Sequence, residues 1–299
     1  MKFGKIDHID EMKFSLPPDH KDMELMWTAQ KNGPEELRVF LGGTMWTIPK
    51  WVGKIYPKGT KAAHFVNAYG KQFGTIELNA THYRTPSAET VRNWSSATPD
   101  DFIFSPKFPQ GISHYRRFNN CEALTDDFLM AVEGFGKKRS HSFIQLPPNY
   151  KSDKHEALIN YLEKLPVDLK CAVEFRHQSW FTGDTPSKET WDFLRSRGIA
   201  TVVTDTAGRR DALHMNLTTP ILIMRFGGYF PHASDQVRMQ QWMDRLKEWK
   251  ARGLKEVHLW MHQPESIFTP ESVIEWAKSF EASLQVSPKR PVITDSLFD

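Results

Sequence analysis

Apolar residues along this chain gather in short runs rich in β-branched and aromatic side chains, and a segment with helical spacing follows most runs. Short apolar runs bounded by turn residues predict strands, whereas apolar positions three or four residues apart predict helices. The strand-like runs number eight and cover residues 38–43, 75–79, 102–107, 142–146, 172–176, 200–205, 221–226 and 256–262.

The alternation of strands and helices decides the fold class. Strands separated by helices pair in parallel, because a parallel neighbour requires a crossover connection. Eight right-handed crossovers close a ring, so we predict an α/β protein with a (β/α)8 barrel of the TIM type. Residues 1–36 are polar and contain Pro17-Pro18 and Gly33-Pro34, which predicts an N-terminal extension, and residues 37–299 then form one barrel domain.

Helix boundaries are also marked in the sequence. Thr-Pro pairs predict helix starts with threonine as the N-cap, at Thr85-Pro86, Thr185-Pro186 and Thr269-Pro270. Glycines that follow helical segments predict C-terminal caps, at Gly136, Gly198 and Gly253. Residues 206–220 have little helical periodicity, so we predict that the sixth crossover is mostly loop.

Polar side chains interrupt the apolar runs near their carboxyl ends. They are Glu77 and Asn79, Lys107, Gln145, Glu174 and Arg176, Asp205, Arg225 and His262. A barrel carries its active site at this end of its strands, and residues two apart share one face of a strand. The pattern predicts a polar pocket at the barrel mouth. A structural network of ion pairs is the alternative explanation.

Composition limits the classes of partner. The formal net charge is +3, and lysines and arginines are spread along the whole chain, so nucleic-acid binding is not favoured. Cys121 and Cys171 show no metal or disulfide spacing, and no stretch of about 18 apolar residues occurs. We therefore expect a cytoplasmic protein that does not enter a membrane, and we make no prediction of oligomeric state.

Several motifs occur in a characteristic order. They are Trp51-Val-Gly-Lys-Ile-Tyr-Pro57, Glu77-Leu-Asn-Ala-Thr-His-Tyr83, Trp94 with Thr98-Pro99, residues 102–107, Gln145-Leu-Pro-Pro148 and Glu174-Phe-Arg176. This series resembles the DUF72 family, also called YecE-like proteins, over roughly residues 38–265. The resemblance implies a TIM-type barrel in a family without an established biochemical activity.

The chain departs from the family pattern in three places. Ser113-His114 stands where Thr-His is usual, Phe226-Gly227 where His-Gly is usual, and His262-Gln263 where an asparagine pair is usual. The last departure makes the eighth strand the part of the pocket to which the family pattern transfers least.

The predicted pocket balances three carboxylates against three fixed cations, which suits a small anionic or phosphorylated ligand. We hypothesise a hydrolase, lyase or isomerase with Glu77 or Glu174 as the proton-transfer residue and Lys107 as an electrostatic stabiliser. His114 is an alternative acid, because its ordinary pKa lies near neutrality. Arg176 and Arg225 are the expected anion clamps. The remaining candidate binding residues are Asn79, Tyr83, Gln145, Asp205 and Trp46.

Other chemistries use the same residue types. Glu77 and Glu174 could serve as the carboxyl pair of a glycosidase. We predict no cofactor but leave a divalent metal open, since the carboxylates with His114 and His262 are suitable ligands, although no HxH or HExxH spacing occurs. A metal-dependent nuclease or phosphodiesterase and a non-catalytic ligand-binding barrel remain alternatives. The aromatic residues Trp46, Trp51 and Tyr56 either pack the barrel rim or form a stacking platform.

Overall fold

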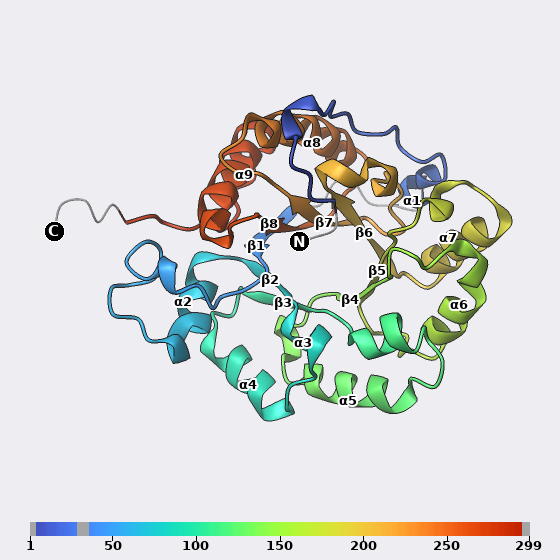
Figure 1. Ribbon diagram of the computed structural model, residues 1–299, viewed down its shortest axis with the longest axis horizontal. Helices are drawn as coiled ribbons and strands as arrows, with labels where there is room; N and C mark the ends of the chain where they lie inside the picture. The colour runs from blue at the N-terminus through green and yellow to red at the C-terminus, as the bar shows by residue number, and fades with distance from the viewer. Residues whose placement is uncertain (1–3, 29–35, 295–299) are drawn as a thin grey trace.

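The computed structural model describes residues 4–28 and 36–294 and contains eight parallel strands in the order β3-β2-β1-β8-β7-β6-β5-β4. They are β1 (Arg38–Gly43), β2 (Thr75–Leu78), β3 (Ile103–Pro106), β4 (Ser142–Gln145), β5 (Cys171–Glu174), β6 (Ala200–Asp205), β7 (Ile221–Gly227) and β8 (Glu256–His262). Backbone bonds from Ser140 to Phe104 (2.8 Å) and from Phe108 to Phe143 (2.9 Å) join β4 to β3. The ring is therefore nearly closed, and the predicted (β/α)8 barrel is confirmed (Figure 1).

Helices surround the ring of strands (Figure 1). They are α1 (Met23–Thr28), α2 (Phe65–Gln72), α3 (Ala80–Tyr83), α4 (Ala88–Ala97), α5 (Glu122–Glu133), α6 (His155–Glu163), α7 (Thr185–Ser196), α8 (Ala233–Ala251) and α9 (Thr269–Leu284). Across the described ranges, none of these helices combines the length and apolar character needed to cross a bilayer.

The helix starts differ in detail from the Thr-Pro prediction. Ser87 is the N-cap of α4 and accepts a bond from Thr90 N at 3.1 Å, while Asp184 caps α7 through Ser187 N at 3.0 Å. Helix α9 begins at Thr269 itself, after a residue without a capping side chain. The prediction of threonine N-caps is therefore wrong, because serine and aspartate beside the Thr-Pro pairs accept those bonds instead.

Two of the three predicted C-terminal glycines are confirmed. Gly198 and Gly253 follow the last turns of α7 and α8 with φ of 62° and 107°, a left-handed conformation that costs glycine little. Helix α5 instead ends at Gly134, and Gly136 begins a separate 3-10 turn.

The sixth crossover lacks an α-helix, as predicted: between β6 and β7 the chain forms only a 3-10 segment, Ala207–Ala212. The N-terminal extension occupies the sector between α7 and α8 that this missing helix leaves open (Figure 1). It is held to α8 and the residues that cap it by the pairs Asp10–His232, Phe14–Gln241, Pro17–Arg245, Asp19–Trp249 and Glu24–Arg252, and to α7 by Asp22–Arg195. Met23, Met26 and Trp27 of α1 are buried.

Below its mouth the interior of the ring is mostly apolar, with the buried hydroxyls of Thr75 on β2 and Ser105 on β3. Phe143, Ala172, Ala200, Val202, Ile223 and Trp260 form a core cluster of their own inside the barrel. The opposite faces of the same strands pack against the helices in a larger core. This inner layer separates the mouth from the lower end of the ring.

Candidate active site at the barrel mouth

A layer of polar side chains lies directly above the apolar interior. Its members come from seven strands or the residues just after them: Glu77, Lys107, Gln145, Glu174, Thr204, Arg225 and His262. Each is at most 9% exposed. Because side chains alternate along a strand, each shares its face with the interior residue two positions earlier. The structure thus brings side chains from distant parts of the chain into one cluster.

Arg225 lies at the centre of this cluster. Its guanidinium donates to Glu77 through Nε (2.9 Å) and Nη2 (2.8 Å), and to Glu174 through Nη1 (2.9 and 3.0 Å). Burial lowers the pKa of Arg225, but Glu174 and Glu77 outweigh burial and raise it above its ordinary value. Its donors are directed at protein carboxylates, so the role of anion clamp predicted from the sequence does not fit this geometry.

The two carboxylates are held in their charged form. Burial alone raises the pKa of Glu77, but Arg225 and His262 outweigh burial and keep it well below the ordinary value. Burial likewise opposes ionisation of Glu174, yet Arg176 and Arg225 lower its pKa to about 2. Neither group therefore holds a proton near neutral pH.

Further bonds saturate both carboxylates. Glu77 accepts from Asn79 Nδ2 (2.9 Å) and lies 2.7 Å from His262 Nε2. Glu174 accepts from Arg176 Nε and Thr204 Oγ1, at 2.8 and 2.7 Å. A carboxylate with this many donors is a poor base, because every bond must weaken when it takes up a proton.

Lys107 has a different environment. Its ammonium donates to Gln145 Oε1 at 2.8 Å and lies 3.5 Å from Asn79 Oδ1, so both partners are neutral amides. Burial is the largest influence on its pKa, followed by Arg225, while Glu77 and Glu174 oppose them only in part. The result is a pKa of about 7. Lys107 is thus divided between its charged and neutral forms near neutral pH.

His114 lies at the edge of the cluster, in the π-helical segment Gly111–Tyr115. Its Nε2 lies 3.4 Å from Gln145 Nε2, and its Nδ1 lies 2.8 Å from Ser113 Oγ. Burial, with Lys107 and Arg176 nearby, lowers the pKa of His114 to about 4. At neutral pH the ring is therefore uncharged and better suited to hydrogen bonding than to acid catalysis.

The floor of the site is aromatic. Lys107 Nζ lies 5.8 Å, and Arg225 Cζ 6.0 Å, from the centre of the Phe143 ring, which packs on Trp260 at 5.1 Å. Cations over an aromatic face are stabilised by its electron density. The rings also keep the polar layer away from the lower end of the barrel, so access is from the mouth.

The aromatic residues of the first loop do not form a platform in the cluster. Trp51 and Tyr56 are each 1% exposed and pack edge to face with ring centres 5.6 Å apart. Trp46 packs on Trp94 at 5.2 Å. Tyr83, another predicted binding residue, is 72% exposed and contacts the ring of His82. The rim-packing interpretation therefore describes Trp51 and Tyr56.

Asp205 does not join the cluster. Its carboxylate accepts from Trp242 Nε1 at 2.7 Å and from Arg238 at 3.2 Å, both on α8, and it also pairs with Arg210. The prediction that Asp205 lines the pocket is wrong. On β6 the residue that faces the interior is Thr204, and the next residue necessarily points outward.

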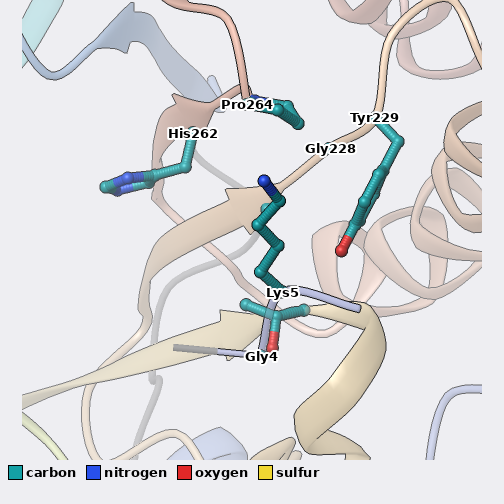
Figure 2. A pocket seen from close by; sticks show the side chains of 8 residues that line it. Gly4, Lys5, Gly228, Tyr229, His262 and Pro264 are labelled. Carbon is teal, nitrogen blue, oxygen red and sulfur yellow. The ribbon is translucent and has the colours of Figure 1, made fainter. Parts of the chain in front are cut away.

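One edge of the mouth carries a small cavity of about 20 Å³ between the ends of β6, β7 and β8. It is lined by Gly4, Lys5, Thr206, Gly227, Gly228, Tyr229, His262 and Pro264. Figure 2 shows the Lys5 side chain reaching into the space between Tyr229 and His262. The N-terminal extension thus contributes to the mouth, which the sequence did not predict, because no local pattern relates residue 5 to β7 and β8.

Among the described residues, no group of three or more His, Cys, Asp or Glu side chains is arranged to hold a metal ion. Glu77, Glu174 and His262 are close together but interleaved with Arg225, as their shared bonds show.

Comparison with known proteins places the barrel in a family. The sequence matches the family described as "Protein of unknown function DUF72" over residues 40–294. The chain belongs to the DUF72 family. This confirms the resemblance found in the sequence motifs. The matched residues 40–294 include every strand end that contributes to the polar layer.

Individual relatives extend the DUF72 assignment. The chain is 28% identical over 253 residues to the UPF0759 protein YecE of Escherichia coli (strain K12), covering 79% of this chain and 90% of that protein. It is 28% identical over 167 residues to the UPF0759 protein YunF of Bacillus subtilis (strain 168), covering 54% and 58%. A crystal structure of a DUF72 family protein from Enterococcus faecalis V583 superposes with a TM-score of 0.62 at 18% identity, covering 84% of this chain and 99% of that one. The DUF72 barrel fold is thus shared.

Proposed function

We propose that this protein is an enzyme of the isomerase or lyase type that moves a proton on a small anionic substrate at the barrel mouth. Lys107 is the proton-transfer residue in this proposal. The observation that carries it is the buried ammonium of Lys107, with a pKa of about 7 and, within residues 4–28 and 36–294, only amide oxygens as hydrogen-bond partners. A general base works best when its pKa lies near the working pH.

The carboxylates take a supporting role. Glu77 and Glu174 stay ionised and fix Arg225 and Arg176 around the site, so the cluster keeps a constant charge while Lys107 gains and loses a proton. Fixed charges and dipoles of this kind stabilise charge that develops during a reaction without having to reorganise. This differs from the assignment made from the sequence, in which the glutamates moved the proton.

A glycosidase receives less support. Both of its common mechanisms require a carboxylic acid that is protonated before the reaction, next to a second carboxylate. Arg225, Arg176 and His262 hold the pKa of both glutamates below the ordinary value, so neither can supply that proton near neutral pH. Lys107 is the group whose pKa suits the transfer.

The test follows solvent deuterium into substrates. Small 2-oxo acids and sugar phosphates are incubated with the protein in D2O, and proton NMR records loss of the signal next to the carbonyl. We expect exchange in at least one class, and a loss of at least about 100-fold in Lys107→Met. Lys137→Met, at an exposed lysine outside the mouth, is the control. Equal catalysed exchange in Lys107→Met and the native protein would contradict the role of Lys107, and no exchange in either protein would favour a non-catalytic barrel.

A further inference from the structure

The N-terminal extension reaches the mouth through a close backbone contact. The Gly208 N–H donates to Gly4 O at 2.8 Å, and Gly4 has a φ of 76°. A Cβ at residue 4 would lie 1.8 Å from Thr206 Oγ1, so a side chain cannot be accommodated there. Glycine thus allows the extension to lie directly on the loop that follows β6.

A second contact fixes the next residues. The Ile6 N–H donates to Tyr229 Oη at 2.8 Å, and Tyr229 itself is held by bonds from its own N–H to Asp235 at 2.8 and 2.9 Å. Lys5 lies between these two anchored positions. Its side chain is therefore directed into the cavity between Tyr229 and His262 (Figure 2).

Lys5 is exposed and, unlike the arginines near it, has no carboxylate partner among the residues that the structure describes. Arg225 is bound to Glu77 and Glu174, and Arg238 is bound to Asp205 and Asp235. Over the described part of the chain, the Lys5 ammonium makes no ion pair or hydrogen bond. The neighbouring Thr206 hydroxyl is buried against Gly4 and has no hydrogen-bond partner among the described residues.

We infer that this cavity is a subsite for the carboxylate of the substrate, with Lys5 supplying the positive charge. This inference rests on the proposed function and names the anionic group that it requires. The cavity holds about 20 Å³, and a water-sized group needs roughly 10 to 15 Å³. That space fits the two oxygens of a carboxylate better than the four oxygens of a phosphate.

The subsite also gives the extension a function. A cation from the first residues of the chain completes the mouth on the β6 to β8 side, while Lys107 lies on the β3 side. A substrate whose carboxylate binds at Lys5 would extend across the mouth toward Lys107. Lys5 is therefore a specificity-determining residue for small carboxylates.

The experiment measures binding without turnover. Sodium acetate is titrated at constant ionic strength, and NMR follows the backbone amides of Thr206, Gly227 and Gly228. We expect saturable shifts at these amides, a Kd at least ten-fold higher in Lys5→Met, and an unchanged Kd in Lys13→Met, an exposed lysine on the same extension. Gly4→Ala, which displaces the segment, should weaken binding as much as Lys5→Met.

Other outcomes overturn the inference. They are the absence of saturable shifts, equal acetate affinity in Lys5→Met and the native protein, and phosphate binding as tight as acetate at the same amides. A pH titration of the Lys107 ammonium distinguishes failure of the carboxylate subsite from failure of the proposed function. If Lys107 titrates near 7 and acetate does not bind, only the subsite is wrong; if acetate binds through Lys5 and Lys107 titrates near 10.5, only the proton-transfer role is wrong.

Discussion

Lys107 is set apart from the other cations of the polar layer by its partners. Arg225 and Arg176 each donate to carboxylates, and such pairing favours the charged form. Lys107 donates to Gln145 and lies beside Asn79, whose amide oxygens carry no net charge. Burial therefore decides its pKa, and a single side chain at the end of β3 becomes the titrating group of the site.

This pKa predicts a pH dependence of stability. Between about pH 7 and pH 10.5 the folded protein has released the Lys107 proton and the unfolded chain still holds it, so the unfolded state binds more protons. The native free energy of unfolding should therefore rise with pH relative to Lys107→Met, by about 1 kcal/mol per pH unit between pH 7 and 9. Urea denaturation of both proteins checks this. Parallel pH profiles would show that Lys107 has an ordinary pKa.

The sequence predicted which strands contribute polar residues, but not always which residue faces inward. On β5 and β7 the inward face is polar only near the mouth, so Glu174 and Arg225 were recognised. On β6 the residues Thr204 and Asp205 are both polar, and both faces of the strand are buried. Burial on both faces removes the alternation that distinguishes inside from outside, so Asp205 was chosen wrongly. Thr204 could be found only from the interior position of Val202.

At the level of elements, the extension replaces a helix. An eight-stranded ring has seven crossovers, whose helices can cover the outside of the strands. The sixth crossover is the loop 206–220, which leaves the sector between α7 and α8 uncovered. The absence of helical periodicity predicted that loop. The segment that covers the open sector is the N-terminal extension, which is distant from the loop in the sequence. Long-range replacement of this kind leaves no local sequence signal, because extended segments bound through their backbone and a few side chains need no regular pattern.

The extension should therefore stabilise the barrel through a few anchors. Asp19 accepts from Trp249 Nε1 at 2.8 Å and pairs with Arg245. We expect Asp19→Ala to lower the free energy of unfolding by about 1 to 3 kcal/mol, because it removes bonds to a charged group. Hydrogen exchange should also become faster in residues 206–220. Asp7→Ala, at an exposed position of the same extension, is the control, and equal effects of both variants would contradict the anchoring role.

For the whole molecule, Arg225 connects opposite sides of the ring. It joins Glu77 on β2 to Glu174 on β5 from its own position on β7. Buried ion pairs are seldom more stabilising than apolar residues of the same shape, so stability alone does not account for this arrangement. Its effect is to hold three distant strands in one geometry around Lys107. The ion-pair network and the active site, which were alternatives at the level of sequence, are in this proposal the same set of residues.

Because Arg225 keeps both buried carboxylates charged, we predict that the pH dependence of stability is reversed in Arg225→Met. In the native protein the pKa of Glu174 is about 2, below its unfolded value, so stability is gained as the pH rises from about 2 to about 4.5. We expect that without the guanidinium burial raises both carboxyl pKa values above the unfolded value, so the variant should lose stability as the pH rises above about 4.5. At pH 7 we expect a deficit of about 3 to 5 kcal/mol, measured by urea denaturation.

A triple variant separates charge from shape. Arg225→Met combined with Glu77→Gln and Glu174→Gln removes all three charges, so most of the lost stability should return because no unpaired charge stays buried. Deuterium exchange should be absent in this variant, because the electrostatic surroundings of Lys107 are gone. A triple variant as unstable as Arg225→Met would mean that packing, and not charge, connects β2, β5 and β7. Restored stability without deuterium exchange would show that the ion pairs of Arg225 with Glu77 and Glu174 serve activity and are not needed for stability.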